Sequence, residues 1–272
     1  MQEHIFEDRI YYRTNEFKPE RLTLVFAHGA GGSSSAWLPY EKIFENKYNI
    51  LSYDIRGHGK SKKYLNYEDY EIKKFAFDLH DLVNYLKIHK FILISNSFAG
   101  LVAFEYIKMW RSDVIGNVFT SPEVFLHEGL FAKIVRPMVS LLSRLFTILP
   151  FDPKPRGQVD YSKHIGSSDW DIKRNLADIR NTTPRVQFYA IQQSLNPKQE
   201  YCLEKIDVPT LVIHGELDSM VPMKNSIRLS KEIKNSEFVC VKNVDHNTVH
   251  NGVKFMSAAI ESFIEKNKNV LK

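Results

Sequence analysis

Short apolar segments alternate along this chain with segments of helical periodicity, and this alternation constrains the fold more than any other feature. The apolar runs predicted to be buried strands cover residues 22–27, 50–54, 91–94, 114–119, 210–213 and 238–241. Apolar positions recur at helical spacing in residues 72–86, 101–110, 225–233 and 253–264. Because strands that alternate with helices pair in parallel through right-handed crossovers, the sequence predicts an α/β fold, in which a mostly parallel central sheet carries helices on both faces.

A central stretch, residues 122–205, breaks this rhythm because it contains no clear strand pattern. The helical patterns predicted within it cover residues 129–149, 169–179 and 185–195. We expect Pro137 to kink or split the first of these helices, because a proline removes a backbone hydrogen bond. We interpret residues 122–205 as a helical cap that is inserted into a single core formed by residues 1–121 and 206–272.

Composition excludes several classes of protein. In the chain of 272 residues, 37 Lys and Arg stand against 32 Asp and Glu, which gives a net charge of +5. These charges are interspersed and form no concentrated basic patch, so we expect no nucleic-acid partner. Cys202 and Cys240 are too few for a disulfide framework or a multi-cysteine zinc site. The first ten residues lack the apolar stretch of a secretion signal, and no apolar run is long enough to cross a membrane, so we predict a cytoplasmic protein.

The segment FILISNSFAG, residues 91–100, is the place where a predicted strand runs through a turn of small residues into a predicted helix. In the G-x-S-x-G nucleophile elbow, small residues stand two places before and two places after the serine, because strand and helix nearly touch there. Ser97 takes the place of the nucleophile in this chain, with Ser95 and Ala99 at the two small positions. The alternative interpretation is that Ser97 only caps the following helix, since serine is a favoured N-cap residue.

A glycine cluster, HGAGG, follows the first predicted strand at residues 28–32. Acyl transfer needs backbone N–H groups that face the developing oxyanion, one directly after the nucleophile and one after an earlier strand. We therefore predict that the N–H groups of Ala30 and Phe98 form an oxyanion hole. The alternative, a phosphate-binding turn, is disfavoured because the glycine spacing matches neither common nucleotide-binding loop.

The last two predicted strands end in polar residues that suit a catalytic triad. Asp218 follows one of them in the string HGELDSMVP, and His246 follows the other in NVDHNTVH. A serine nucleophile needs a histidine that takes its proton and a carboxylate that orients this histidine. The chain order is then Ser97, Asp218, His246. Glu216 and His250 are the competing acid and base, and each polar residue taken alone is also typical of a turn or a helix cap.

Together these motifs resemble those of the α/β-hydrolases, and the resemblance extends over residues 10–270. It rests on the strings HGAGG, YDIRGHGKS, ISNSFAG, HGELDSMVP and NVDHNTVH. It implies that Ser97 is the nucleophile, Asp218 the acid and His246 the base. It also implies that residues 54–59 shape the mouth of the site and that the inserted helices correspond to the cap or lid of this family.

The chain departs from the family pattern at two places. Ser95 and Ala99 stand where the elbow commonly has glycine, and Asp245 precedes the histidine where glycine is usual. Neither departure removes a catalytic group. The extra carboxylate beside the histidine is expected to raise the pKa of the base, because a nearby negative charge favours the imidazolium.

The serine at the elbow also narrows the chemistry that the resemblance implies. Haloalkane dehalogenases and epoxide hydrolases of this fold use aspartate at that position, so both are disfavoured. We predict a serine hydrolase that cleaves a carboxylic ester through an acyl-enzyme intermediate, without a metal or an organic cofactor. A thioesterase or a carbon–carbon bond hydrolase is the alternative among enzymes. A non-catalytic ligand-binding protein on the same fold is the alternative from another class.

The first cap segment, residues 129–149, suggests what kind of substrate the site takes. It is apolar over most of its circumference, and Lys133, Arg136 and Arg144 are its charged residues. Either it packs as a buried helix pair, or it lines an apolar acyl pocket above Ser97 and touches lipid through its basic residues. We therefore predict a lipophilic small-molecule ester as substrate, with peripheral membrane contact through the cap. The sequence leaves the oligomeric state open.

Overall fold

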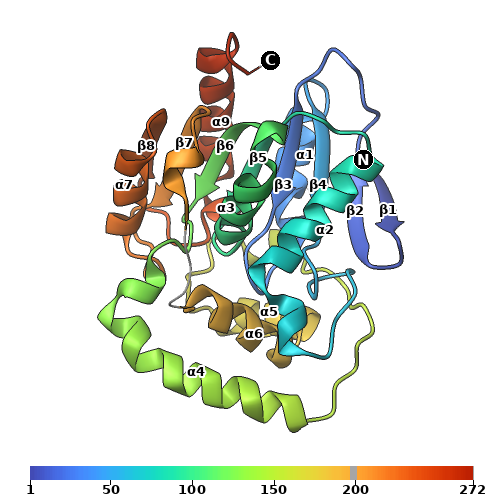
Figure 1. Cartoon of the computed structure of the whole chain (residues 1–272), viewed down its shortest axis with the longest axis vertical. Coiled ribbons are helices and arrows are strands. Elements are labelled where there is room, and N and C mark those ends of the chain that lie inside the picture. The colour runs from blue at the N-terminus through green and yellow to red at the C-terminus, as the bar shows by residue number, and fades with distance from the viewer. Residues whose placement is uncertain (197–200, 272) are drawn as a thin grey trace.

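An eight-stranded sheet in the order β1-β2-β4-β3-β5-β6-β7-β8 forms the centre of the computed structural model (Figure 1). The structure describes residues 1–196 and 201–271. The strands are β1 (Gln2–Phe6), β2 (Ile10–Thr14), β3 (Thr23–Ala27), β4 (Asn49–Tyr53), β5 (Phe91–Asn96), β6 (Val114–Thr120), β7 (Thr210–Gly215) and β8 (Ser236–Val241). All pairings among β3 to β8 are parallel, whereas β1 pairs with β2 and β2 with β4 in antiparallel fashion. The predicted α/β fold with a mostly parallel sheet is confirmed.

The hairpin of β1 and β2 at the edge of the sheet was not predicted. Its turn contains Glu7 and Asp8, which adopt positive φ angles of 47° and 52°. Such a turn is usually recognised by glycine or asparagine, and neither residue occurs here. β1 exposes four of its five residues to solvent, so its sequence lacks the apolar run that marks the central strands.

Helices cover both faces of the sheet, and each face has its own apolar core (Figure 1). One core is packed by α2 (Ile72–Tyr85), α3 (Ala99–Trp110) and α7 (Met223–Glu232), and the other by α1 (Leu38–Phe44) and α9 (Val253–Asn267). The remaining short helix of the core is α8 (Thr248–Asn251). The 3-10 helices are η1 (Ser34–Trp37), η2 (Tyr67–Tyr70), η3 (Arg111–Asp113), η4 (Leu126–Glu128), η5 (Tyr161–His164) and η6 (Leu203–Lys205). The core helices thus bury one apolar stripe each, as their periodicity predicts.

Three helices between β6 and β7 lie beyond one end of the sheet (Figure 1). They are α4 (Leu130–Ile148), α5 (Ile172–Thr182) and α6 (Pro184–Ser194). α4 packs on α6 through a small apolar cluster that includes Val139, Phe188 and Leu195. α6 therefore lies between α4 and the sheet, and α4 is the outermost element of this part of the molecule.

Pro137 lies inside α4, which continues for 19 residues without interruption. The expectation that this proline splits the helix is therefore wrong. A proline inside a helix leaves the carbonyl four residues earlier without its hydrogen bond. Lys133, which carries that carbonyl, is exposed, as is Pro137, so water can take the place of the missing donor.

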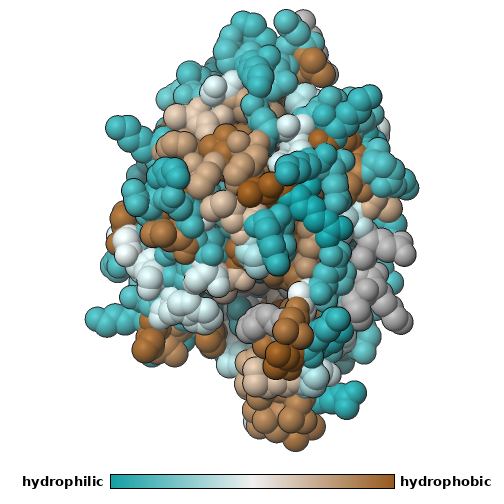
Figure 2. All heavy atoms as spheres, turned by 90° about the vertical axis from the view of Figure 1, so that its left-hand side faces the viewer, coloured by the Kyte–Doolittle hydropathy of each residue, from teal (hydrophilic) through white to brown (hydrophobic). Residues whose placement is uncertain are grey.

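The outer face of α4 is a continuous apolar stripe open to solvent. The apolar side chains of this stripe recur every three or four residues along the helix. The solvent-exposed fractions of these residues are 73% for Leu130, 68% for Ile134, 56% for Met138, 68% for Leu141, 47% for Leu145 and 77% for Ile148. Figure 2 shows apolar side chains gathered at this end of the molecule. The interpretation of residues 129–149 as a buried helix pair is thus wrong for this face. Within the described residues, no helix combines the length and apolarity needed to span a membrane.

Candidate active site

Ser97 lies at the sharp turn between β5 and α3. Its φ angle of 54° falls in the left-handed region, which non-glycine residues rarely adopt. The Ser97 N–H donates to the carbonyl of Thr120 at 2.8 Å, and this bond anchors the turn to β6. Strain of this kind is typical of a serine held at a nucleophile elbow. The Ser97 side chain does not cap α3, whose first turn has no side-chain cap, so the simpler interpretation as an N-cap does not hold.

The structure brings Ser97, His246 and Asp218 together in one chain of contacts. His246 Nε2 lies 2.9 Å from Ser97 Oγ. On the other side of the ring, Nδ1 donates to Asp218 Oδ2 at 2.8 Å. The side chain of Asp218 is fully buried, and its second oxygen accepts hydrogen bonds from the N–H groups of Met220 and Val221 at 2.9 and 2.8 Å. The carboxylate is thereby fixed in one orientation toward the histidine.

The loops after β7 and β8 approach each other closely enough to require glycine at one point. A Cβ atom at Gly215 would lie 2.2 Å from the carbonyl oxygen of Asp245. A side chain at this position would therefore push the two loops apart. Asp218 and His246 follow these two positions by three and one residues, so the close approach sets the separation of these two side chains.

Asp169, a buried residue of the segment between β6 and β7, also holds these loops together. Its Oδ1 accepts a hydrogen bond from the N–H of His246 at 2.8 Å. Its Oδ2 accepts two from Ser219, from the N–H at 2.9 Å and from the hydroxyl at 2.7 Å. No sequence motif contains Asp169, and only the folded chain places it beside His246 and Ser219.

Charges around His246 favour its protonated form. Burial alone lowers the pKa of His246, but the hydrogen bond and charge of Asp218, followed by the charges of Glu123 and Asp169, raise it overall above its ordinary value. For Asp218, burial raises the pKa, yet the hydrogen bond and charge of His246 lower it overall. An acid that stays ionised beside a base of raised pKa suits a histidine that must take a proton and pass it on.

The competing acid and base lie outside this chain of contacts. Glu216 accepts hydrogen bonds from Lys242 Nζ at 2.7 Å and from the N–H of Asn243 at 3.0 Å. His250 stacks on Tyr161 with the ring centroids 4.0 Å apart, and burial lowers its pKa to about 3. The imidazole of His250 is therefore neutral at physiological pH, and no carboxylate among the described residues forms a hydrogen bond with it.

The carboxylate of Asp245, the unusual residue before His246, forms its hydrogen bonds with groups other than the His246 ring. It accepts hydrogen bonds from the N–H of Asn247 at 3.0 Å and from Asn251 at 3.1 Å. Burial and the nearby charge of Asp169 raise the pKa of Asp245. The carboxylates that raise the pKa of His246 are Asp218, Glu123 and Asp169, so the expected effect arises from other residues than Asp245.

Of the two residues predicted for the oxyanion hole, Ala30 lines the same cavity as Ser97, whereas Phe98 is fully buried beside it. This cavity has a volume of about 60 Å³ and is lined by Ala30, Ser97 and His246 together with the side chains of Trp37 and Tyr161. The Phe98 N–H directly follows the nucleophile. In the described part of the chain, neither the Ala30 N–H nor the Phe98 N–H donates to another backbone carbonyl.

The segment after β4 supports the glycine cluster, as expected for the mouth of the site. Asp54 accepts hydrogen bonds from the N–H of Ser34 at 2.7 Å and of Lys60 at 2.8 Å. His28 Nε2 accepts the N–H of Ile55 at 3.1 Å, and burial lowers the pKa of His28, so it is a neutral structural residue. These contacts fix the loop that carries Ala30 and leave no proton-transfer role for His28.

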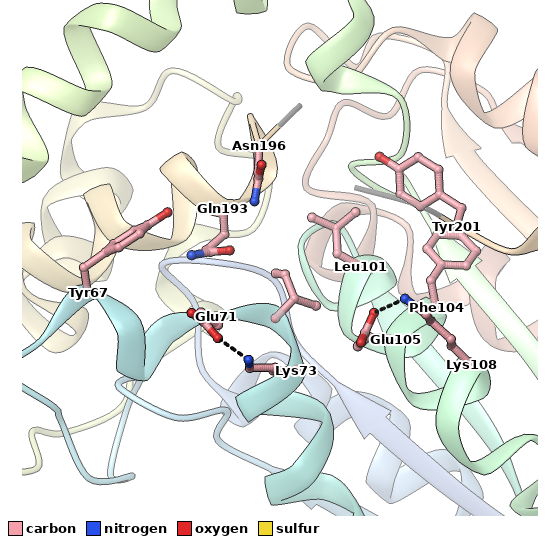
Figure 3. A pocket seen from close by; sticks show the side chains of 11 residues that line it. Tyr67, Glu71, Lys73, Leu101, Phe104, Glu105, Lys108, Gln193, Asn196 and Tyr201 are labelled. Atoms are coloured by element: carbon pink, nitrogen blue, oxygen red, sulfur yellow. Dashed lines mark ion pairs between the residues drawn. The ribbon is translucent and has the colours of Figure 1, made fainter. Parts of the chain in front are cut away.

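Residues of α4 do not appear among the described residues that line the cavity at Ser97. The expectation that residues 129–149 line an acyl pocket therefore differs from the structure, because α6 separates α4 from the nucleophile. A larger hollow of about 370 Å³ lies between α2, α3 and the end of α6 (Figure 3). It is lined by the charged pairs Glu71–Lys73 and Glu105–Lys108 and by no residue of the triad. It is a polar surface hollow apart from the site.

The sheet order, the helices on both faces and the strained serine elbow define an α/β-hydrolase. The family described as serine aminopeptidase, S33, matches residues 18–252, and the chain belongs to this family. Monoacylglycerol lipase ABHD6 of Mus musculus is 27% identical over 251 residues, which cover 85% of this chain and 71% of the lipase. Proline iminopeptidase PfmaB of Pestalotiopsis fici is 24% identical over 270 residues, which cover 92% of this chain and 93% of that protein.

A solved structure confirms the fold independently. MGS-M2, an α/β-hydrolase enzyme from a Medee basin deep-sea metagenome library, has a TM-score of 0.73 and 18% identity, and the match covers 97% of each chain. The family match and the relatives, which include a lipase and an iminopeptidase, identify this chain as a member of a hydrolase family. The alternative of a non-catalytic ligand-binding protein is thereby set aside.

Proposed function

We propose that this enzyme is a serine esterase in which Ser97 is the nucleophile, His246 the general base and Asp218 the acid that orients it. The observation that supports this most is the unbroken chain of contacts from Ser97 Oγ through His246 to Asp218, at 2.9 and 2.8 Å. These distances lie within hydrogen-bond reach, which is the geometric requirement for proton transfer from the nucleophile. No step needs a metal or an organic cofactor.

In the proposed reaction, His246 takes the proton of Ser97 Oγ while this oxygen bonds to the ester carbonyl carbon. The resulting oxyanion accepts hydrogen bonds from the N–H groups of Ala30 and Phe98. His246 then gives the proton to the alcohol oxygen, the bond between this oxygen and the carbonyl carbon breaks, and the acyl group stays on Ser97. A water molecule repeats the sequence with the same base and releases the acid.

We infer a lipophilic small-molecule ester as the substrate. The relative named monoacylglycerol lipase supports this choice. The cavity at Ser97, about 60 Å³, is smaller than the roughly 300–1,000 Å³ of typical ligand sites, so a long acyl chain requires displacement of Tyr161 and its neighbours. Residues 122–205 then act as a cap that opens for the substrate.

Labelling with a fluorophosphonate probe, followed by peptide mapping, tests the nucleophile. We expect the label on the peptide that contains Ser97, and turnover of p-nitrophenyl esters from acetate to decanoate by the unlabelled enzyme. Ser97→Ala should remove both labelling and turnover. Labelling at another serine contradicts the assignment. A matched thioester or p-nitroanilide that is turned over faster than the ester contradicts the proposed reaction and favours a thioesterase or a peptidase.

We also propose that the stripe on α4 contacts a lipid surface. The helix carries three basic residues, Lys133, Arg136 and Arg144, and no acidic residue. Lys133 and Arg144 are exposed and flank the apolar side chains. Exposed apolar side chains beside positive charge are the features by which amphipathic helices bind anionic lipid interfaces.

Cosedimentation with vesicles of phosphatidylcholine and phosphatidylglycerol tests this contact. The wild-type chain should bind, and Ile134→Asp with Leu141→Asp should abolish binding while p-nitrophenyl acetate turnover in solution persists. Ile5→Asp is a matched control, because Ile5 is 62% exposed on β1, outside the cap helices. The proposal is overturned if the double variant binds the vesicles as well as the wild type does. It is also overturned if the wild type forms a stable dimer and the double variant is a monomer.

A further inference from the structure

A second histidine, His214, lies against the carboxylate of Asp218. It is the fifth residue of β7 and is fully buried. Its Nε2 lies 3.5 Å from Asp218 Oδ2, the oxygen that also accepts the hydrogen bond from His246 Nδ1 at 2.8 Å. Its Nδ1 lies 2.8 Å from the hydroxyl oxygen of Ser226 on α7. No step of the proposed reaction uses this ring, so its place against the acid needs an explanation of its own.

The contacts of His214 determine which of its ring nitrogens carries the proton. Burial, the largest effect, lowers the pKa of His214 overall although the charge of Asp218 raises it, so the ring is neutral and has one N–H and one acceptor nitrogen. A proton on Nδ1 would leave the lone pair of Nε2 facing a negatively charged oxygen in a fully buried place. A proton on Nε2 directs an N–H group at Asp218 and lets the hydroxyl of Ser226 donate to Nδ1. The second arrangement makes both contacts favourable, so the proton belongs on Nε2.

This contact adds a further donor group around the carboxylate of Asp218. An ionised carboxylate can accept about four hydrogen bonds, and the fully buried side chain of Asp218 must find its donors within the protein. Oδ1 accepts the N–H groups of Met220 and Val221, and Oδ2 accepts His246 Nδ1. His214 Nε2 faces Oδ2 at a distance longer than an ordinary hydrogen bond, so it acts through its N–H dipole. Without His214, the carboxylate would concentrate more of its charge on His246.

We propose that His214 is a positioning residue that keeps Asp218 ionised and directed at His246 by pointing its Nε2–H at the shared oxygen. The inference rests on the proposed triad and adds a fourth side chain to it. In the reaction, His246 gains the proton of Ser97 and must then give this proton to the alcohol oxygen. A carboxylate whose charge is shared between two imidazole N–H groups holds the imidazolium less tightly, so the proton can be passed on. Ser226 supports this role from α7, because its hydroxyl fixes the tautomer of His214.

The pH dependence of two His214 variants tests this role. His214→Phe keeps a ring without a donor, whereas His214→Gln keeps an N–H donor on its side-chain amide. The measured quantity is kcat/KM for p-nitrophenyl butyrate, which rises with pH as His246 becomes neutral. In His214→Phe, Asp218 attracts the imidazolium of His246 more strongly, so the pKa of His246 rises and the midpoint should move up by about half a pH unit. His214→Gln should show less than half of this shift, because the donor is retained.

The control must separate the lost donor from lost packing. The other carboxylates that raise the pKa of His246 are Glu123, whose Oε1 accepts a hydrogen bond from Ser97 Oγ at 2.9 Å, and Asp169, and all variants keep both. Val212→Ala is the matched control, because Val212 is buried on the same face of β7, two residues before His214, and the change removes packing but no donor. It should lower the melting temperature without moving the midpoint.

Three results would overturn the inference while ester hydrolysis itself stands. The first is a midpoint in His214→Phe that stays at the wild-type value or moves down. The second is an equal upward shift in Val212→Ala. The third is a His214 proton on Nδ1 in the long-range ¹H–¹⁵N NMR spectrum of the wild type, a measurement that does not depend on the folding of a variant. If the wild type hydrolyses no p-nitrophenyl ester, the proposed function fails instead.

Discussion

Replacing Asp218 with asparagine is the substitution whose result the structure determines most closely. Oδ1 of Asp218 accepts the N–H groups of Met220 and Val221 at 2.9 and 2.8 Å, while Oδ2 accepts His246 Nδ1 at 2.8 Å. The amide oxygen of the variant must take the place of Oδ1, because an NH₂ group there would face two N–H donors. The NH₂ group must therefore point at His246.

An NH₂ group at this point donates to Nδ1 and so requires Nδ1 to be unprotonated. The ring proton then resides on Nε2, and His246 can no longer accept the proton of Ser97. The corresponding substitution in the serine-protease triad lowers kcat about 10⁴-fold, which is about 5.4 kcal/mol of transition-state stabilisation. We expect a loss of this size for Asp218→Asn, with little change in the folded structure, since the two side chains have the same shape.

The assay is kcat for p-nitrophenyl butyrate, together with the melting temperature as a measure of folding. Glu216→Gln is the matched control, because Glu216 precedes Asp218 in the same turn but pairs with Lys242 at 2.7 Å. The control should keep activity within about threefold of the wild type, as is usual for a surface substitution of at most about 0.5 kcal/mol. An Asp218→Asn enzyme within tenfold of the wild type, or a Glu216→Gln enzyme that is equally impaired, would refute the reasoning.

The remaining predictions concern the nucleophile, the base and the loop contact. Ser97→Ala should lower kcat on the order of 10⁴-fold or more, while Ser95→Ala, two residues earlier, should stay active. The reverse pattern would show that Ser95, and not Ser97, is the nucleophile. The base must be neutral and the pKa of His246 is raised, so kcat/KM should rise with pH through a midpoint above 6.5; a midpoint below 6.5 contradicts this. Gly215→Ala places a Cβ atom 2.2 Å from the carbonyl of Asp245, so we expect a lower melting temperature and at least about a tenfold loss of activity, which kinetics and thermal unfolding would reveal. Wild-type values in both measurements would contradict it.

The central strands and the proximity of Ser97, Asp218 and His246 were predictable because local signals and long-range geometry agree there. β5 begins with the apolar run of residues 91–94 and leads into the turn of small residues that holds Ser97. Asp218 and His246 follow the ends of β7 and β8 by three and five residues, and parallel strands bring the residues after their carboxyl ends to one edge of the sheet. The order of the strands in the chain therefore predicts the proximity of these side chains.

Other features depend on contacts that no local pattern contains. The outward orientation of the apolar face of α4 was missed, because periodicity shows that a stripe exists but not whether another element covers it. Asp169 and Glu123 were missed as well, since each reaches the site through a loop whose path is set by packing. The turn at Glu7 and Asp8 was missed because its positive φ angles occur at residues that usually avoid them.

The two hydrogen-bonding directions of Asp169 have a consequence for evolution and for protein engineering. One oxygen holds the backbone of His246, the proposed base, and the other holds Ser219, the residue after the proposed acid, although Asp169 itself belongs to the segment between β6 and β7. The insertion is therefore not an exchangeable module on a self-sufficient catalytic core. Deleting the insertion, or replacing it with the insertion of a relative that lacks an equivalent carboxylate, removes the hydrogen bonds that join the loops after β7 and β8. In this chain, the inserted segment and the core must then be redesigned together.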